Sequence, residues 1–115
     1  MRRRPLTEWW RACKEAAVAF DQAERALCHR EFSKAYRWLR RGRQMMAAEG
    51  WTPSKHGPLV IRGRALRAVE LCEEGEPDAA RECCFAALRG LAAMIDFIEE
   101  EMTPEDFVTL GLDQP

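Results

Sequence analysis

The side chains best suited to metal chemistry in this sequence are two histidines and five cysteines. Cys28 and His29 are adjacent, as are Cys83 and Cys84, and all four carry sulfur or nitrogen atoms that can bind Zn²⁺. Their spacing matches no pattern of zinc-binding proteins. His56 lies apart from them, in a segment rich in proline and glycine. We therefore predict neither a metal site nor a cofactor, and keep a metal-dependent enzyme built on Cys28 and His29 as an alternative.

The carboxylates do not form an evident acid–base pair. Glu73–Glu74 and Glu99–Glu101 lie near predicted helix ends, where acids are normally solvated. Asp96 is the acid closest to an apolar helix face, and an arginine from a neighbouring helix could pair with it. The sequence has no glycine-rich phosphate loop and no GxSxG, HExxH or EF-hand pattern. Since no nucleophile is placed beside a base, we predict no catalytic residue and no enzymatic activity.

Charge is divided unevenly between the two halves of the chain. Residues 1–67 hold 16 of the 18 lysines and arginines and six acids, a net charge of +10. Residues 68–115 hold two arginines and 13 acids, a net charge of −11. Such asymmetry indicates that the first half attracts polyanions and the second half repels them.

The basic residues are concentrated on one face of a predicted helix. Helical periodicity places Arg30, Lys34, Arg37 and Arg41 together, opposite the apolar side chains of the same segment. Arg40 and Arg43 widen this positive zone, and Trp38 and Met45 lie beside it, away from the apolar side. This pattern predicts a partner-binding surface for an acidic protein, with nucleic acid as the alternative partner; its residues are Arg30, Lys34, Arg37, Trp38, Arg40 and Arg41. Pairing of the stripe with the chain's own acids remains open.

The elements that position these residues are helices. Helix-forming Ala, Leu, Arg and Glu dominate, alternating strand patterns are missing, and Gly and Pro punctuate the chain. We predict one all-α domain over residues 1–115, a four-helix bundle of two antiparallel hairpins plus a short C-terminal helix. The hairpins span about residues 7–50 and 59–102, with helices at about 7–28, 31–49, 59–74 and 77–102, a loop at 51–58 and the short helix at about 104–110. The two hairpins resemble each other weakly at a spacing of 44 residues.

The helix predicted over 77–102 is apolar on most of its circumference. Heptad spacing aligns Leu88, Leu91, Ile95 and Ile98 on one stripe. A helix of this kind is either the central helix of its own bundle or shared with a second copy of the chain. We favour the central helix and retain these four residues as the interface of a possible homodimer.

The stretch from Trp9 to Leu59, about half of the chain, resembles the opening of the HEPN superfamily of small helical domains. The shared features are a first helix ending in Ala-Leu, a tight turn before Phe32, a second helix, a Gly50…Pro53 break and Lys55–His56. Catalytic HEPN ribonucleases carry an Arg-x(4–6)-His motif, which precedes neither His29 nor His56. The resemblance therefore implies a non-catalytic member, with a degenerate nuclease as an alternative. The short hairpins and their alanine spacing also resemble tetratricopeptide-like repeats, whose signature residues are incomplete here.

The N-terminus and the cysteines bear on location. Met1 to Arg4 are followed by Pro5 rather than by an apolar run, which argues against a signal peptide. Arg81, Glu82, Arg89 and Asp96 interrupt the most apolar stretch, so no membrane span is expected. An odd number of cysteines without a CxxC motif suits the reducing cytoplasm. The sequence as a whole predicts a cytoplasmic, non-enzymatic protein-interaction module, such as an adaptor, an inhibitor or a regulatory subunit.

Overall fold

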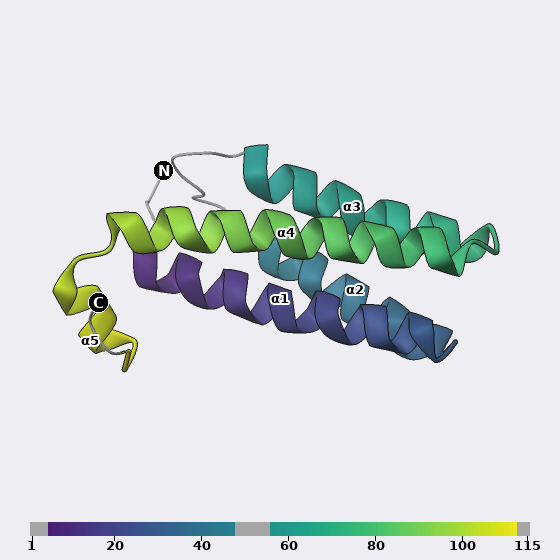
Figure 1. Ribbon diagram of the computed structural model, residues 1–115, viewed down its shortest axis with the longest axis horizontal. Helices are drawn as coiled ribbons and strands as arrows, with labels where there is room; N and C mark the ends of the chain where they lie inside the picture. Colours follow the sequence, from purple (N-terminus) through teal and green to yellow (C-terminus); the bar gives the residue numbers. More distant parts are fainter. Residues whose placement is uncertain (1–4, 48–55, 113–115) are drawn as a thin grey trace.

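The computed structural model describes residues 5–47 and 56–112, and these residues are helical apart from short turns (Figure 1). Four long helices and one short helix follow one another: α1 Leu6–Cys28, α2 Phe32–Met46, α3 His56–Glu73, α4 Pro77–Glu101 and α5 Pro104–Thr109. No strand occurs within the described ranges. The predicted all-α class and the two hairpins with a short C-terminal helix are confirmed.

The four long helices form a bundle in which each helix occupies one corner. α1 packs against α2 and α4, and α3 packs against α4 and α2. Within the described residues, the backbones of α1 and α3 do not approach each other closely, and neither do those of α2 and α4. α2 and α4 therefore lie at diagonally opposite corners of the bundle, and their outer faces point away from each other. In Figure 1 the turns of both hairpins lie at the same end of the bundle.

The core is built from apolar side chains of all four long helices. Its largest fully buried members are Trp9, Phe20, Leu27, Leu39, Met46 and Leu91. No polar or charged residue of the described chain is buried, so the core is stabilised by the removal of apolar surface from water. None of the described helices is long and apolar enough to cross a membrane.

The two hairpin turns share one backbone geometry. In the first turn, the Glu31 N–H donates to the Ala26 carbonyl at 2.8 Å. In the second, the Glu76 N–H donates to the Leu71 carbonyl at 2.7 Å. Both bonds span five residues, as in a Schellman motif, which satisfies carbonyls left free at a helix end. The register between the hairpins is therefore 45 residues, and the predicted spacing of 44 is wrong by one.

Two predicted boundaries differ from the structure by more than one residue. α3 begins at His56 rather than at Leu59, so the predicted loop of 51–58 is too long. Pro58 favours a loop in the sequence pattern, but proline is also tolerated in the first turn of a helix, where its missing N–H has no intrahelical partner. α2 ends at Met46 rather than at Glu49. Residues 1–4 and 48–55, which include Arg2–Arg4 and most of the predicted loop, lie outside the described residues.

The short helix α5 begins as its sequence predicts. The Asp106 N–H donates to Thr103 Oγ1 at 3.3 Å, and the Thr103 N–H donates to Asp106 Oδ2 at 2.8 Å. This reciprocal pair is a capping box, and Pro104 occupies the first helical position after it. Of the long helices, α5 contacts α1.

Candidate protein interface on α2

The predicted basic stripe is exposed in the structure. Ala35, Leu39, Gly42 and Met46 turn one side of α2 into the bundle, so the opposite side faces solvent. That side, with its margins, carries six exposed basic side chains, which we call the basic α2 face: Arg30 in the preceding turn, and Lys34, Arg37, Arg40, Arg41 and Arg43 on the helix. α2 itself carries five basic residues and no acid, a net charge of +5.

Most of this positive charge is unpaired. Lys34 Nζ lies 3.0 Å from Glu31 Oε2, an exposed pair between residues three positions apart. The five arginines of the basic α2 face form no ion pair with any described residue. Like charges held together on one helix repel each other, so the surface is electrostatically open to an anionic partner.

Three acids of the second half of the chain that could have paired with the stripe interact elsewhere. Glu74 pairs with Arg67 at 3.5 Å, Asp78 pairs with Arg81 at 3.8 Å, and Glu99 accepts a hydrogen bond from Trp10. In the described parts of the chain, no ion pair joins the basic α2 face to the acidic second half.

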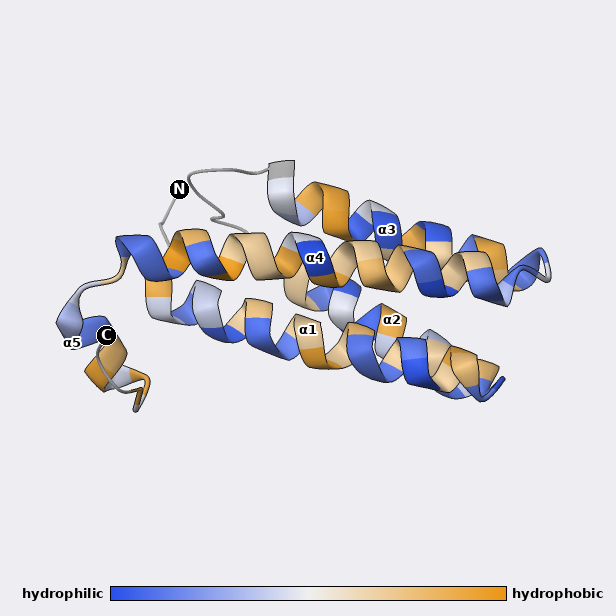
Figure 2. Cartoon of the chain, in the orientation of Figure 1, coloured by the Kyte–Doolittle hydropathy of each residue, from blue (hydrophilic) through white to orange (hydrophobic). Residues whose placement is uncertain are grey.

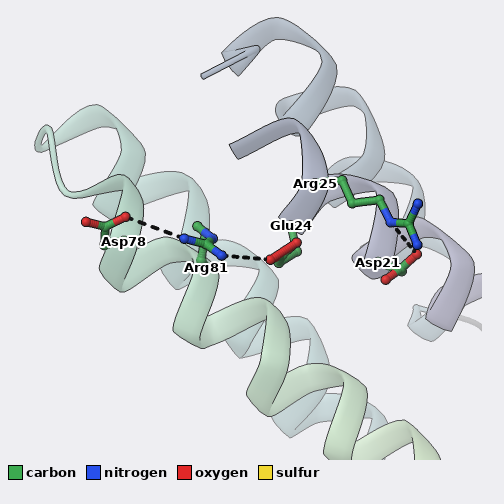
Figure 3. Close-up of polar contacts among 5 residues, drawn as sticks. All are labelled: Asp21, Glu24, Arg25, Asp78 and Arg81. Carbon is green, nitrogen blue, oxygen red and sulfur yellow. Dashed lines mark hydrogen bonds and ion pairs between the residues drawn. The ribbon is translucent and has the colours of Figure 1, made fainter. Parts of the chain in front are cut away.

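A hydrogen-bonded ion pair joins the two hairpins near the end of the bundle where both turns lie (Figure 1), and it does not involve the basic α2 face. Arg81 Nη2 on α4 donates to Glu24 Oε1 on α1 at 3.0 Å, as Figure 3 shows. This hydrogen bond is the main reason that the pKa of Arg81 is raised. Arg25, one position after Glu24, pairs instead with Asp21 at 3.2 Å along its own helix.

A groove between α2 and α3 adjoins the basic α2 face. It encloses a cavity of about 270 Å³. Its lining combines an apolar floor with two of the unpaired arginines: Tyr36, Leu39, Arg40, Arg43, Ala65, Leu66, Val69 and Glu73. Burial raises the pKa of Tyr36, and the nearby Cys72 and Glu73 add to the effect. Leu66 is 42% exposed and extends the apolar surface toward solvent.

The groove between α2 and α3 was not predicted from the sequence. A signal does exist, because α3 has more apolar residues than one face can bury. Ile61, Ala65 and Ala68 are buried, whereas Leu59 and Leu66 remain exposed. Apolar residues in excess of the core positions are typical of a binding surface.

Trp38 does not stand out as a fully exposed anchor. Its side chain is half-buried and packs against the core, as does Met45. The expectation that both lie away from the core is wrong. Both residues lie on the flank of α2, where burial depends on the neighbouring helix rather than on periodicity within α2. Trp38 can offer only its exposed edge to a partner.

The predicted homodimer residues lie mostly inside the bundle. Leu91, Ile95 and Ile98 are buried in the core formed by the chain itself, and Leu88 is half-buried against it. α4 is thus a core helix of its own bundle, as we favoured from its periodicity. In the packed monomer, three of these four side chains are not available to a second copy.

A second, shallow cleft lies between α1, α4 and α5. Trp10, Lys14, Asp96, Glu99 and Phe107 are among its lining residues. The Trp10 Nε1–H donates to Glu99 Oε1 at 2.9 Å, and Lys14 Nζ lies 5.1 Å from the centroid of the Trp10 ring. The cation and the indole stabilise each other, and the Glu99 carboxylate is occupied by the hydrogen bond. These contacts give the cleft a structural role in holding the end of the bundle together.

The cysteines and His29 are spread over the bundle. Cys28 and His29 are exposed at the first turn, Cys83 is half-buried, and Cys84 is buried. Across the described ranges, no three His, Cys, Asp or Glu residues lie close enough to hold a metal ion. Burial raises the pKa of Cys13 and of Cys84 to about 12, so both stay protonated and unreactive at neutral pH.

Comparisons with known proteins give this chain no relative. No family model, no curated protein and no solved structure matches it. The resemblance to HEPN domains and to tetratricopeptide-like repeats therefore stays a prediction.

Proposed function

We propose that this chain is a non-enzymatic protein-interaction module that binds an acidic partner protein through the basic α2 face. The observation that supports this most directly is the set of five exposed arginines without an ion pair in the described chain. An acidic partner would neutralise them, and charge complementarity would give the encounter both speed and specificity. In such a role the chain would serve as an adaptor, an inhibitor or a regulatory subunit in the cytoplasm.

The groove between α2 and α3 favours a protein partner over nucleic acid. Its apolar floor, formed by Leu39, Ala65 and Val69 beside Arg40 and Arg43, suits an apolar side chain flanked by carboxylates. Stacking of bases would instead require aromatic rings presented on the open surface. Of the aromatic residues of α2, Tyr36 lines the groove, Trp38 packs against the core, and Phe32, which is 36% exposed, lies at the start of the helix.

The double variant Arg37→Glu with Arg41→Glu tests this proposal. Both side chains are exposed and unpaired, so we expect unchanged folding by circular dichroism. Tagged protein is used to recover partners from extracts of the native host, with and without nuclease treatment, and mass spectrometry identifies them. We expect proteins that bind the wild type in both treatments and are lost with the double variant. With a purified partner, the affinity should fall about 10- to 100-fold.

A matched control reverses two exposed arginines on other helices, Arg11→Glu with Arg64→Glu. This control changes the net charge by the same amount and should recover the same proteins as the wild type. Equal recovery by Arg37→Glu with Arg41→Glu and by the wild type would refute a role for the basic α2 face.

Nucleic acid is the second candidate partner, and the diagonal placement of α2 and α4 favours it. α4 carries two arginines and six acids, a net charge of −4, and these acids would repel a phosphate backbone. The bundle holds them on the corner opposite the basic α2 face. Under this alternative, gel-shift assays with short DNA and RNA duplexes and single strands would show affinity that falls steeply with salt, because bound phosphates release counterions. A lack of binding at low salt would exclude it.

A further inference from the structure

The outer face of α4 carries apolar side chains in its middle section, between charged residues at its two ends. Phe85 is 37% exposed and Phe97 is 45% exposed, and Ala92 and Ala93 lie exposed between them. The buried Cys84, Leu91 and Ile98 occupy the opposite side of the same helix. Figure 2 shows apolar residues distributed along the length of α4. The two rings are twelve positions apart, about 120° around the helix, so they lie at the two margins of its exposed side. Exposed apolar side chains gathered in this way are typical of a contact surface.

Two opposite charges lie on this same face, and they are the only charged residues between Phe85 and Phe97. Arg89 and Asp96 are both exposed, and neither forms an ion pair with a described residue. They are seven positions apart, which is about 10 Å along a helix. The two side chains are therefore stacked along one line of α4 and are well separated from each other.

Arg89 and Asp96 are placed symmetrically about the midpoint between Ala92 and Ala93. If two copies of α4 pack antiparallel around a two-fold axis at that midpoint, Arg89 of each copy faces Asp96 of the other. Ala92 and Ala93 then lie at the centre of the contact, where their small side chains let the helices approach closely. A parallel pair would instead place Arg89 against Arg89, which is unfavourable.

We propose that this outer face of α4 is the interface of a symmetric homodimer in which two Arg89–Asp96 ion pairs flank a central alanine contact. Its occupant is a second copy of this chain, because the face is complementary to itself under two-fold rotation. A contact of one helix per copy is smaller than the ~1,600 Å² of a standard interface, so we expect a dissociation constant on the order of 10 to 100 µM.

The proposed dimer is independent of the proposed function and compatible with it. α2 occupies the corner of the bundle opposite α4. Two copies joined through α4 would expose their basic α2 faces on opposite sides of the assembly. A partner with two acidic sites would then bind with increased avidity.

Charge exchange within the interface provides the test. Sedimentation equilibrium of the full chain is measured from about 5 µM to 1 mM. We expect the wild type to dimerise with increasing concentration, and Arg89→Asp or Asp96→Arg alone to weaken dimerisation at least about tenfold, because each creates like-charge contacts. The exchanged variant, Arg89→Asp with Asp96→Arg, restores opposite charges in both pairs and should dimerise like the wild type.

The controls separate this interface from folding and from the basic α2 face. Circular dichroism should show unchanged helix content in all three variants, since both side chains are exposed and unpaired in the monomer. Arg37→Glu, on the opposite corner, should leave dimerisation unchanged. The proposal fails if the wild type remains monomeric at 1 mM, if the single variants dimerise normally, or if the exchanged variant is as weak as the single ones.

Discussion

The turns of the α1–α2 hairpin and the α3–α4 hairpin have the same backbone geometry but contain residues of opposite charge. The first turn contains His29 and Arg30, whereas the second contains Glu74 and Gly75, and the hydrogen bonds of the two turns correspond one to one. The hairpins also differ in how closely their helices pack, with tight packing at Gly42 and looser packing at Gly90. Backbone geometry is thus repeated, whereas surface charge is not. The charge of the turn residues does not determine the backbone geometry of the turns. These charges can therefore contribute to binding.

The largest expected effect concerns the reactivity of two buried thiols, Cys13 on α1 and Cys84 on α4, at the contact between the two hairpins. Burial raises the pKa of Cys13 on α1 and of Cys84 on α4 to about 12, so at pH 8 only about one molecule in 10⁴ carries either thiolate. Cys28 is exposed at the first turn. Timed alkylation of the native protein, read by mass spectrometry, should modify Cys28 at least about 1,000-fold faster than Cys13 or Cys84.

The pH dependence of alkylation has a definite sign. The thiolate population of Cys13 and Cys84 rises about tenfold for each pH unit below pH 12, so native-state alkylation should accelerate as pH increases. If Cys13 and Cys84 react as fast as Cys28 at pH 8, the two hairpins separate readily, and the single core described above does not hold.

The next largest effect is on the free energy of unfolding, when alanine replaces each of the two glycines, Gly42 and Gly90, that lie where two helices pack together. A Cβ added at Gly42 would lie 2.8 Å from Phe20 Cζ, and Phe20 is fully buried, so Gly42→Ala should destabilise the fold by about 1–3 kcal/mol. At Gly90 the nearest atom, Ile61 Cγ1, lies at 3.4 Å, an ordinary contact. Gly90→Ala should be neutral or stabilise by up to about 1 kcal/mol, because alanine favours helices.

Urea unfolding of the two glycine variants at matched protein concentration measures both free energies. Gly63→Ala is the control, since no atom lies within 4 Å of its added Cβ. Equal destabilisation by Gly42→Ala and Gly90→Ala would show that the two hairpins are packed equally tightly.

The smallest effect concerns the turns themselves. Arg30 has a φ of 57° and Gly75 a φ of 79°, a region that favours glycine. Gly75→Ala should destabilise the protein by about 1 kcal/mol, and Arg30→Gly should stabilise it by about 0.5–1 kcal/mol. Thermal unfolding followed by circular dichroism distinguishes the two signs. A loss of stability in Arg30→Gly would mean that the Arg30 side chain stabilises the first turn.

The number of helices and their pairing were predictable because the signals are local. Gly75 and Pro77 mark one turn, and the capping residues of α5 mark its start. The exposure of Arg37 and Arg41 was also predictable, since one clear apolar face on α2 determines which side remains in water. The start of α3 was not, because Pro58 is compatible with both a loop and a first helical turn.

Features that depend on neighbouring helices could not be derived from periodicity. α3 has apolar residues on several sides, and only the positions of α2 and α4 decide that Ile61 is buried and Leu66 exposed. The burial of Trp38 likewise depends on the helix that packs beside α2 and not on periodicity within α2. For α4, the heptad stripe alone could not distinguish a core helix from one shared between two copies.

The diagonal arrangement of α2 and α4 separates a positive helix from a negative one, so these two helices contribute a dipole moment across the bundle rather than along it. The net charge is only −1, so attraction at long range depends on orientation more than on total charge. An approaching acidic protein would turn the bundle so that α2 meets it first. Salt near physiological strength limits this steering to separations of about 8 Å. The arrangement thus selects the orientation in which an acidic partner docks during the last step of approach, where the acids of α4 repel that partner.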